Sequence, residues 1–291
     1  MFKGSMVALV TPFRNGKIDE KALKGLVEFH ITNDTSALVP CGTTGESATI
    51  SFEEHDRVIE LVVEYVRGRI PVIAGTGSNS TAEAIMMTQH ARKAGADASL
   101  QVSPYYNRPT QKGLYLHFKA VAESVDMPIV LYNIASRTGV NIEPETVAKL
   151  AHEVKNIVGI KEASGSLDQM SRIAALCPKE FDLISGDDSL TLPILSIGGT
   201  GVISVVANIV PKDVSRMIDY FEKGQCDKAR GLHYALLGLV KAMFVETNPI
   251  PVKTAMGLMG MIDPEVRLPL CEMLPENKEK LVKALKGYKL I

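Results

Sequence analysis

Short apolar runs alternate with amphipathic segments along most of the chain, at intervals of roughly 20 to 35 residues, the length of a strand plus a crossover helix. Most of these runs are continuously apolar, which is typical of parallel strands covered on both faces. We predict strands at Met6–Val10, Ala37–Pro40, Pro71–Ala74, Ala98–Val102, Pro128–Tyr132, Val158–Lys161, Asp182–Ser185 and Gly201–Ser204.

The intervals between these runs carry helix signals. Ser51 with Glu54, and Ser80 with Glu83, have the spacing of capping boxes, and the second helix is expected to end near Ala94-Gly95. Eight strand–helix units predict an α/β protein with a (β/α)₈ TIM barrel over residues 1–224, closed by a helix at Pro211–Lys223. A doubly wound open sheet is the competing architecture, but no G-x-G-x-x-G follows the first strand.

The remainder of the chain shows helical patterns and no strand. Ala235–Val245 and Val252–Met261 are rich in apolar residues and methionine, which more often fill a core or an interface than bind a cofactor. We therefore predict a small C-terminal helical domain over residues 225–291.

Charge and cysteine content narrow the class of protein. The 291 residues include 32 Lys+Arg and 33 Asp+Glu, which argues against nucleic acid or an anionic membrane as a partner. No apolar stretch approaches the ~20 residues that span a bilayer, and Met1–Pro12 is predicted to be a first strand rather than a signal peptide. The four cysteines form no C-x-x-C pair, so we expect a reducing, cytoplasmic location.

Lys161 lies in the apolar segment Ile157–Ser164, where a lysine is unusual. Burial disfavours the charged ammonium, and a neutral amine is the nucleophile that Schiff-base chemistry requires. The alternative is a structural lysine paired with the neighbouring Glu162. If Lys161 points into the barrel, strand alternation places Gly159 inward too, where we expect it to leave room beside the amine.

A tyrosine and two loops are expected near this amine, because the carboxyl ends of barrel strands share one face. Tyr132 is predicted to point inward and to shuttle protons, with a core tyrosine as the alternative. The loop Gly42–Ser47 could cradle an anion on its N–H groups, although an ordinary turn would look similar. Arg137 suits a carboxylate, with a surface ion pair as the alternative, and Gly186 would let a ligand approach the backbone.

Acidic residues at strand ends raise the question of a metal. Glu46, Asp187 and Asp188 have no histidine beside them, since the six histidines fall mostly in helical stretches. An iminium on Lys161 would also make a metal redundant as the electron sink. We expect no metal and no cofactor.

Five motifs together carry a family resemblance: Gly42–Ser47, Tyr132–Asn133, Ser136–Gly139, Gly159–Ala163 and Gly201–Ser204. In this order the chain resembles the pyruvate-dependent class I aldolases of the N-acetylneuraminate lyase superfamily, most closely the dihydrodipicolinate synthase family, over essentially its whole length. One departure is Ala135, where members usually have proline. We expect a looser loop there with unchanged chemistry at Arg137.

The resemblance implies condensation of pyruvate with L-aspartate 4-semialdehyde, giving 4-hydroxy-tetrahydrodipicolinate in the diaminopimelate route to lysine. It implies the imine on Lys161 and a hydroxyl relay of Tyr132, Thr43 and Tyr106, the last supplied by a neighbouring subunit. A homo-oligomer, typically a dimer of dimers, is therefore expected. Further implied contacts are Thr44 and backbone groups of Gly186 and Ile203 for pyruvate, and Arg137 for the semialdehyde.

Two other functions remain open at this point. N-acetylneuraminate and 2-keto-3-deoxy-sugar-acid lyases share the lysine and tyrosine, but a sugar polyol calls for several neutral hydrogen-bonding groups where this chain has Arg137. A non-catalytic metabolite-sensing barrel would be expected to lack Lys161 or Tyr132, and both are present.

By the same resemblance, L-lysine is expected to inhibit at a second site. The matching residues are Ser47, Ala48, His55, Asn79, Glu83 and Tyr105. Glu83 can pair with an ammonium, while Asn79 and Tyr105 can hydrogen-bond a carboxylate. Alternatively, Glu83 merely completes a capping box and His55 is a surface histidine. Phe52 replaces a polar residue of some inhibited relatives and is expected to weaken the response.

Overall fold

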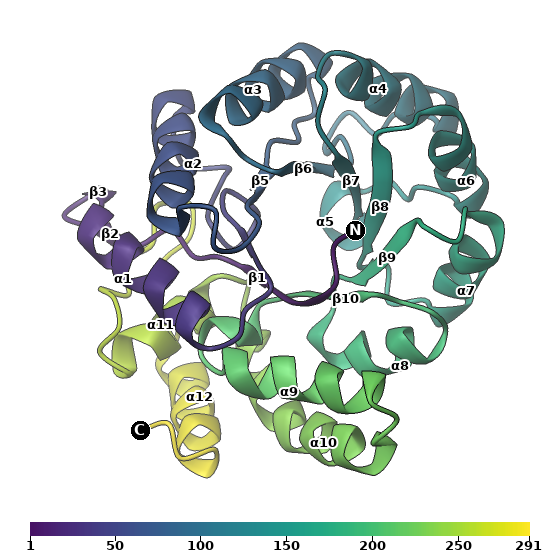
Figure 1. Ribbon diagram of the computed structural model, residues 1–291. Coiled ribbons are helices and arrows are strands. Elements are labelled where there is room, and N and C mark those ends of the chain that lie inside the picture. The colour runs from purple at the N-terminus through teal and green to yellow at the C-terminus, as the bar shows by residue number, and fades with distance from the viewer.

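A single sheet of eight parallel strands forms the centre of the protein. The computed structural model describes residues 1–291, and its strands are β1 (Gly4–Ala8), β4 (Ala37–Val39), β5 (Ile73–Gly75), β6 (Ala98–Val102), β7 (Ile129–Asn133), β8 (Ile157–Glu162), β9 (Asp182–Ser185) and β10 (Gly201–Ser204). They pair in the order β4-β1-β10-β9-β8-β7-β6-β5. A parallel bridge between Leu38 and Val72 closes the ring. The predicted (β/α)₈ barrel is confirmed, with small shifts at the strand ends (Figure 1).

Helices surround this ring. Those that follow the strands are α1 (Glu20–Thr32), α2 (Phe52–Val66), α3 (Thr81–Ala94), α4 (Gln111–Glu123), α6 (Pro144–Glu153), α7 (Leu167–Leu176), α8 (Thr191–Ser196) and α9 (Pro211–Glu222). Shorter elements lie in the loops: the hairpin β2 (Phe13–Arg14) and β3 (Lys17–Ile18), the single turn α5 (Ala135–Thr138), and two 3₁₀ turns, η1 (Asp188–Leu190) and η2 (Val206–Asn208). The hairpin of β2 and β3 was not predicted from the sequence.

The two predicted capping boxes have different outcomes. Ser51 and Glu54 form a complete box at the start of α2. Ser80 accepts the N–H of Glu83, but the Glu83 carboxylate accepts the Ser78 hydroxyl at 2.7 Å instead of the Ser80 N–H. The predicted second capping box is therefore wrong, because the Glu83 side chain does not accept the N–H of the N-cap residue Ser80.

Strand alternation separates two apolar layers. One lies inside the barrel and includes Val130, Tyr132 and Ile203, while the larger layer lies between the sheet and the helices. A Cβ on Gly159 would lie 2.9 Å from the Cβ of Asp182. Gly159 therefore makes space for the neighbouring strand β9, which is a reason for glycine other than the expected room beside the amine.

Three helices follow the barrel: α10 (Cys226–Met243), α11 (Ile250–Leu258) and α12 (Pro275–Gly287). As predicted, this region contains no strand. The helix α10 packs against α9 and α12 (Figure 1), while α11 contacts η2. Across the whole chain, no helix has both the length and the apolar character needed to cross a bilayer.

Candidate active site

Lys161 and Tyr132 lie side by side near the carboxyl ends of neighbouring strands. They occupy paired positions on β8 and β7, and both side chains are buried. The Lys161 Nζ is 4.3 Å from the centroid of the Tyr132 ring. Strand alternation thus brings the two predicted chemical groups together inside the barrel.

The adjacent carboxylate of Glu162 serves a different purpose. It accepts hydrogen bonds from Asn133 Nδ2, the Ser164 N–H and Gln169 Nε2, at 2.6 to 3.3 Å. Consecutive strand residues point to opposite faces, so Glu162 lies behind the sheet. No carboxylate lies within 4.0 Å of Lys161. The alternative of a structural lysine paired with Glu162 is wrong.

The loop after β4 offers unoccupied donors. The N–H groups of Gly45, Glu46 and Ser47 donate to carbonyls within the loop, at 3.1 to 3.3 Å, whereas those of Thr43 and Thr44 donate to no group of the chain. The Thr44 Oγ1 accepts Nδ2 of Asn248 at 3.0 Å, so its own hydrogen remains available. Two adjacent N–H groups and a hydroxyl suit a carboxylate ligand.

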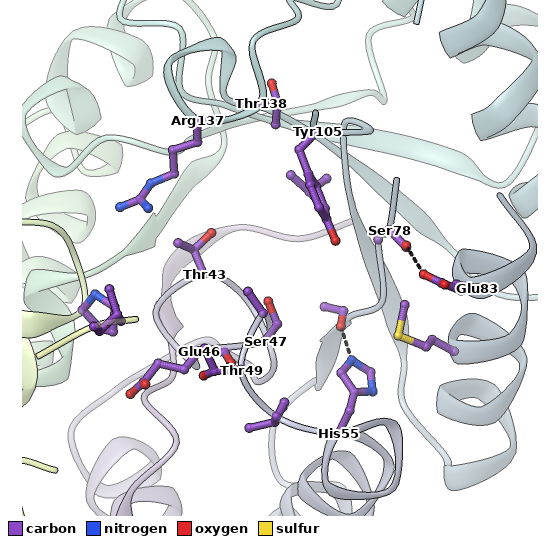
Figure 2. Close-up of a pocket in the computed structure, with 18 of the residues that line it drawn as sticks. Thr43, Glu46, Ser47, Thr49, His55, Ser78, Glu83, Tyr105, Arg137 and Thr138 are labelled. Atoms are coloured by element: carbon purple, nitrogen blue, oxygen red, sulfur yellow. Dashed lines mark hydrogen bonds between the residues drawn. The ribbon is translucent and has the colours of Figure 1, made fainter. Parts of the chain in front are cut away.

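A cavity of ≈ 730 Å³ opens beside this loop, and Thr43, Arg137 and Asn248 line it (Figure 2). Arg137 belongs to the single turn α5, which the Gly139 N–H closes onto the Ala135 carbonyl at 2.9 Å. Its Nη2 donates to the Asn248 carbonyl at 3.1 Å, and it forms no ion pair within the chain, so the alternative of a surface ion pair is wrong.

Asn248 is a site residue that the sequence analysis missed. Its side chain holds Thr44 and its carbonyl holds Arg137, which are 204 and 111 residues away in the chain. No local pattern marks such a residue, because its importance comes entirely from which two segments it connects.

The two residues expected to offer backbone groups to pyruvate lie on β10 (Ile203) and directly after β9 (Gly186). Ile203 is part of the inner apolar layer with Tyr132. The Gly186 N–H donates to the Glu162 carbonyl at 2.8 Å, and a Cβ there would lie 2.6 Å from that of Ala163. Glycine is therefore required for packing against the chain after β8, which is a different reason from the expected approach of a ligand.

Two of the three acidic residues at strand ends have their carboxylates engaged with the protein. Glu46 pairs with Lys253, and the Asp188 carboxylate accepts the N–H groups of Val205 and Val206. Burial raises the pKa of Asp187, and the charge of Lys161 opposes that shift. No group of three or more His, Cys, Asp or Glu side chains is arranged to hold a metal ion.

Tyr106 lies outside this cavity. Its side chain is 91% exposed on a backbone with φ of +69°. Asn79 Nδ2 donates to the Tyr105 carbonyl at 3.2 Å, and Asn107 Nδ2 donates to the Asn79 carbonyl at 2.8 Å. These bonds fix the loop that presents Tyr106 outward, so one chain alone does not assemble a relay of Thr43, Tyr132 and Tyr106.

Most residues of the expected lysine site line the same cavity, namely Ser47, Ala48, His55, Glu83 and Tyr105 (Figure 2). Asn79 does not line it, and its amide nitrogen donates to the Tyr105 carbonyl. The His55 ring is buried, with Nε2 2.8 Å from the Gly75 carbonyl, and burial lowers its pKa. The alternative of a surface histidine is therefore wrong.

Comparison with known proteins agrees with this geometry. Residues 1–288 match the Dihydrodipicolinate synthetase family. The 4-hydroxy-tetrahydrodipicolinate synthase of Syntrophus aciditrophicus is 60% identical over 100% of both chains. The crystal structure of dihydrodipicolinate synthase from Aquifex aeolicus is 53% identical, with a TM-score of 0.98 over 99% of both chains. A third relative, the enzyme from Cyanidioschyzon merolae with lysine bound, is 42% identical, with a TM-score of 0.97 over 100% of this chain and 99% of that one. The chain belongs to the Dihydrodipicolinate synthetase family.

Proposed function

We propose that this protein is a 4-hydroxy-tetrahydrodipicolinate synthase, which condenses pyruvate with L-aspartate 4-semialdehyde in lysine biosynthesis. The observation that carries the proposal is the buried Lys161 amine, which has no carboxylate partner and lies 4.3 Å from the Tyr132 ring. The curated relatives, at 56–60% identity over the whole chain, have this activity in their names.

The proposed reaction begins with attack of the Lys161 amine on the ketone carbon of pyruvate. Loss of water gives an iminium, which acidifies C3, and loss of a C3 proton gives an enamine. Tyr132 transfers protons in these steps. The pyruvate carboxylate lies on the N–H groups of Thr43 and Thr44 and the Thr44 hydroxyl, with backbone groups of Gly186 and Ile203 completing its site.

The enamine then attacks the aldehyde carbon of the semialdehyde, whose carboxylate binds Arg137. The semialdehyde amine subsequently attacks the iminium carbon, closes the ring and releases Lys161. Arg137 supports this choice of aldehyde because a guanidinium binds a carboxylate with two parallel hydrogen bonds.

The proposal includes a homo-oligomer, for which a dimer of dimers is the expected assembly. In it, Tyr106 of one subunit completes the hydroxyl relay of a neighbouring subunit. The exposed, fixed position of Tyr106 supports it. It also includes inhibition by L-lysine in the part of the cavity that Glu83 and His55 line, supported by the lysine-bound relative. Location in the cytoplasm stays a prediction.

The decisive experiment offers pyruvate with aspartate semialdehyde, with N-acetylmannosamine and with sugar aldehydes in parallel coupled assays. Of these aldehydes, only aspartate semialdehyde is expected to be turned over with pyruvate. Borohydride added with pyruvate should fix an adduct on the peptide that contains Lys161, and Lys161→Ala should abolish it. Preferred use of a sugar aldehyde, or an adduct on another lysine, would overturn the proposal.

A further inference from the structure

A second buried lysine lies directly beneath the loop after β4. Lys253 of α11 is 0% exposed, and its Nζ lies 2.6 Å from Oε1 of Glu46, which is equally buried. The same Nζ donates to the Thr11 carbonyl at 3.0 Å and lies 4.2 Å from the centroid of the Phe13 ring. Burial lowers the pKa of Lys253, and Glu46 opposes that shift. Buried ion pairs contribute little net stability, so this one calls for another explanation.

The pair fixes the loop at Glu46, a residue of positive φ whose side chain is buried. Glu46 has φ of +55°, and its second carboxylate oxygen accepts the Arg267 N–H at 3.1 Å. Its own N–H donates to the Thr43 carbonyl at 3.1 Å, and its carbonyl accepts the Thr49 N–H at 3.0 Å. Every hydrogen-bonding group of Glu46 is therefore engaged in holding this turn.

The preceding residue is anchored as well. The Thr11 hydroxyl donates to the Gly45 carbonyl at 2.8 Å, and a Cβ on Gly45 would lie 3.1 Å from the Leu9 carbonyl oxygen. Figure 2 shows Glu46 and Thr43 on the same loop, beside the paler yellow ribbon of the C-terminal region. The loop is thus held through Gly45 and Glu46, while the N–H groups of Thr43 and Thr44 stay available to a ligand.

We propose that Glu46 and Lys253 are positioning residues, which hold Thr43 and Thr44 in the geometry that binds the carboxylate of pyruvate. The inference rests on the proposed function and makes α11, outside the barrel, part of the binding machinery. Two unoccupied N–H groups bind an anion well only when their directions converge, and a turn that relaxes by about 1 Å loses that convergence.

The test measures the pyruvate concentration needed for half-maximal borohydride trapping at Lys161, alongside the melting temperature. We compare Glu46→Gln, Lys253→Met and the double variant Glu46→Gln/Lys253→Met. Lys253→Met leaves a buried carboxylate unpaired and should melt earlier. The double variant removes both charges and should recover much of that loss, yet it should still need about tenfold more pyruvate because the anchoring bonds are gone. Glu46→Gln can still accept the Arg267 N–H and should give a smaller increase.

Tyr288→Phe is the matched control. It removes a 2.7 Å hydrogen bond by which Tyr288, just after α12, holds Asp213 of α9, so it perturbs the attachment of the same helical region far from the loop. It should lower the melting temperature without changing the pyruvate dependence. Wild-type pyruvate dependence in both the double variant and Glu46→Gln would overturn the inference. Absence of trapping in the wild-type protein would instead overturn the proposed function.

Discussion

Replacing Arg137 with alanine tests which aldehyde the site accepts. In the structure its guanidinium makes one hydrogen bond, to the Asn248 carbonyl, and no ion pair, so it is free to bind a carboxylate in the cavity. Loss of a hydrogen bond to a charged group typically costs about 1.5–3 kcal/mol, a factor of about ten to a hundred. Arg137 is exposed in the single chain, and screening by water places the expected loss near the lower end of this range.

The assay measures kcat/KM for aspartate semialdehyde at saturating pyruvate, and imine formation by borohydride trapping with pyruvate alone. Arg137→Ala should reduce semialdehyde use by about tenfold or more and leave the trapping largely unchanged. Arg137→Lys keeps the charge but loses the planar guanidinium. Its kcat/KM for the semialdehyde should fall between those of the wild type and Arg137→Ala.

Arg92→Ala is a matched control, because Arg92 also donates to one backbone carbonyl, that of Asp126, and does not line the cavity. It should leave both measurements unchanged. If Arg137→Ala abolished trapping and left semialdehyde use intact, the assignment of the two substrates within the cavity would be incorrect.

Three further predictions address assembly, regulation and pH. Mixing inactive Tyr106→Phe with inactive Lys161→Ala subunits should restore part of the activity through hybrid sites, whereas a fully active monomer by light scattering would contradict subunit sharing. Millimolar L-lysine should slow the coupled reaction without competing with pyruvate, and Phe52 at the cavity wall should keep this inhibition weak. Glu83→Ala should relieve the inhibition. Inhibition that survives this change would show that Glu83 is not part of the regulatory site. Burial lowers the pKa of His30 from 6.5 to about 3, so between these values the unfolded chain binds a proton that the folded chain excludes. The free energy of unfolding should therefore fall as the pH drops below 6.5, by about 2 kcal/mol at pH 5 from this group. In urea unfolding, the stability of His30→Gln should depend less on pH than that of the wild type. An identical pH dependence in the two proteins would contradict the lowered pKa of His30.

The barrel and the central pair of the candidate site could be predicted from the sequence, because both depend on local periodicity. Continuous apolar runs at regular intervals are sufficient to predict parallel strands and crossover helices, and the two-residue alternation of a strand placed Tyr132 and Lys161 inside the barrel. An isolated lysine within an apolar run is visible without coordinates. The packing reason for Gly159 and Gly186 could not be predicted in the same way, since the contact that excludes a Cβ comes from a neighbouring strand or loop.

Only the tertiary structure revealed the residues that support the site from a distance. Asn248, Glu46 and Lys253 act through contacts that span more than 100 residues of chain, and nothing in their immediate sequence predicts the partners that they meet. Lys253 lies in an apolar helical segment much as Lys161 lies in an apolar strand, yet one amine meets a buried carboxylate and the other does not. Sequence periodicity determines which face of an element a side chain occupies. What that side chain meets there is decided by the packing of segments that are distant in the chain, and that packing gives Lys253 a carboxylate partner and leaves Lys161 without one.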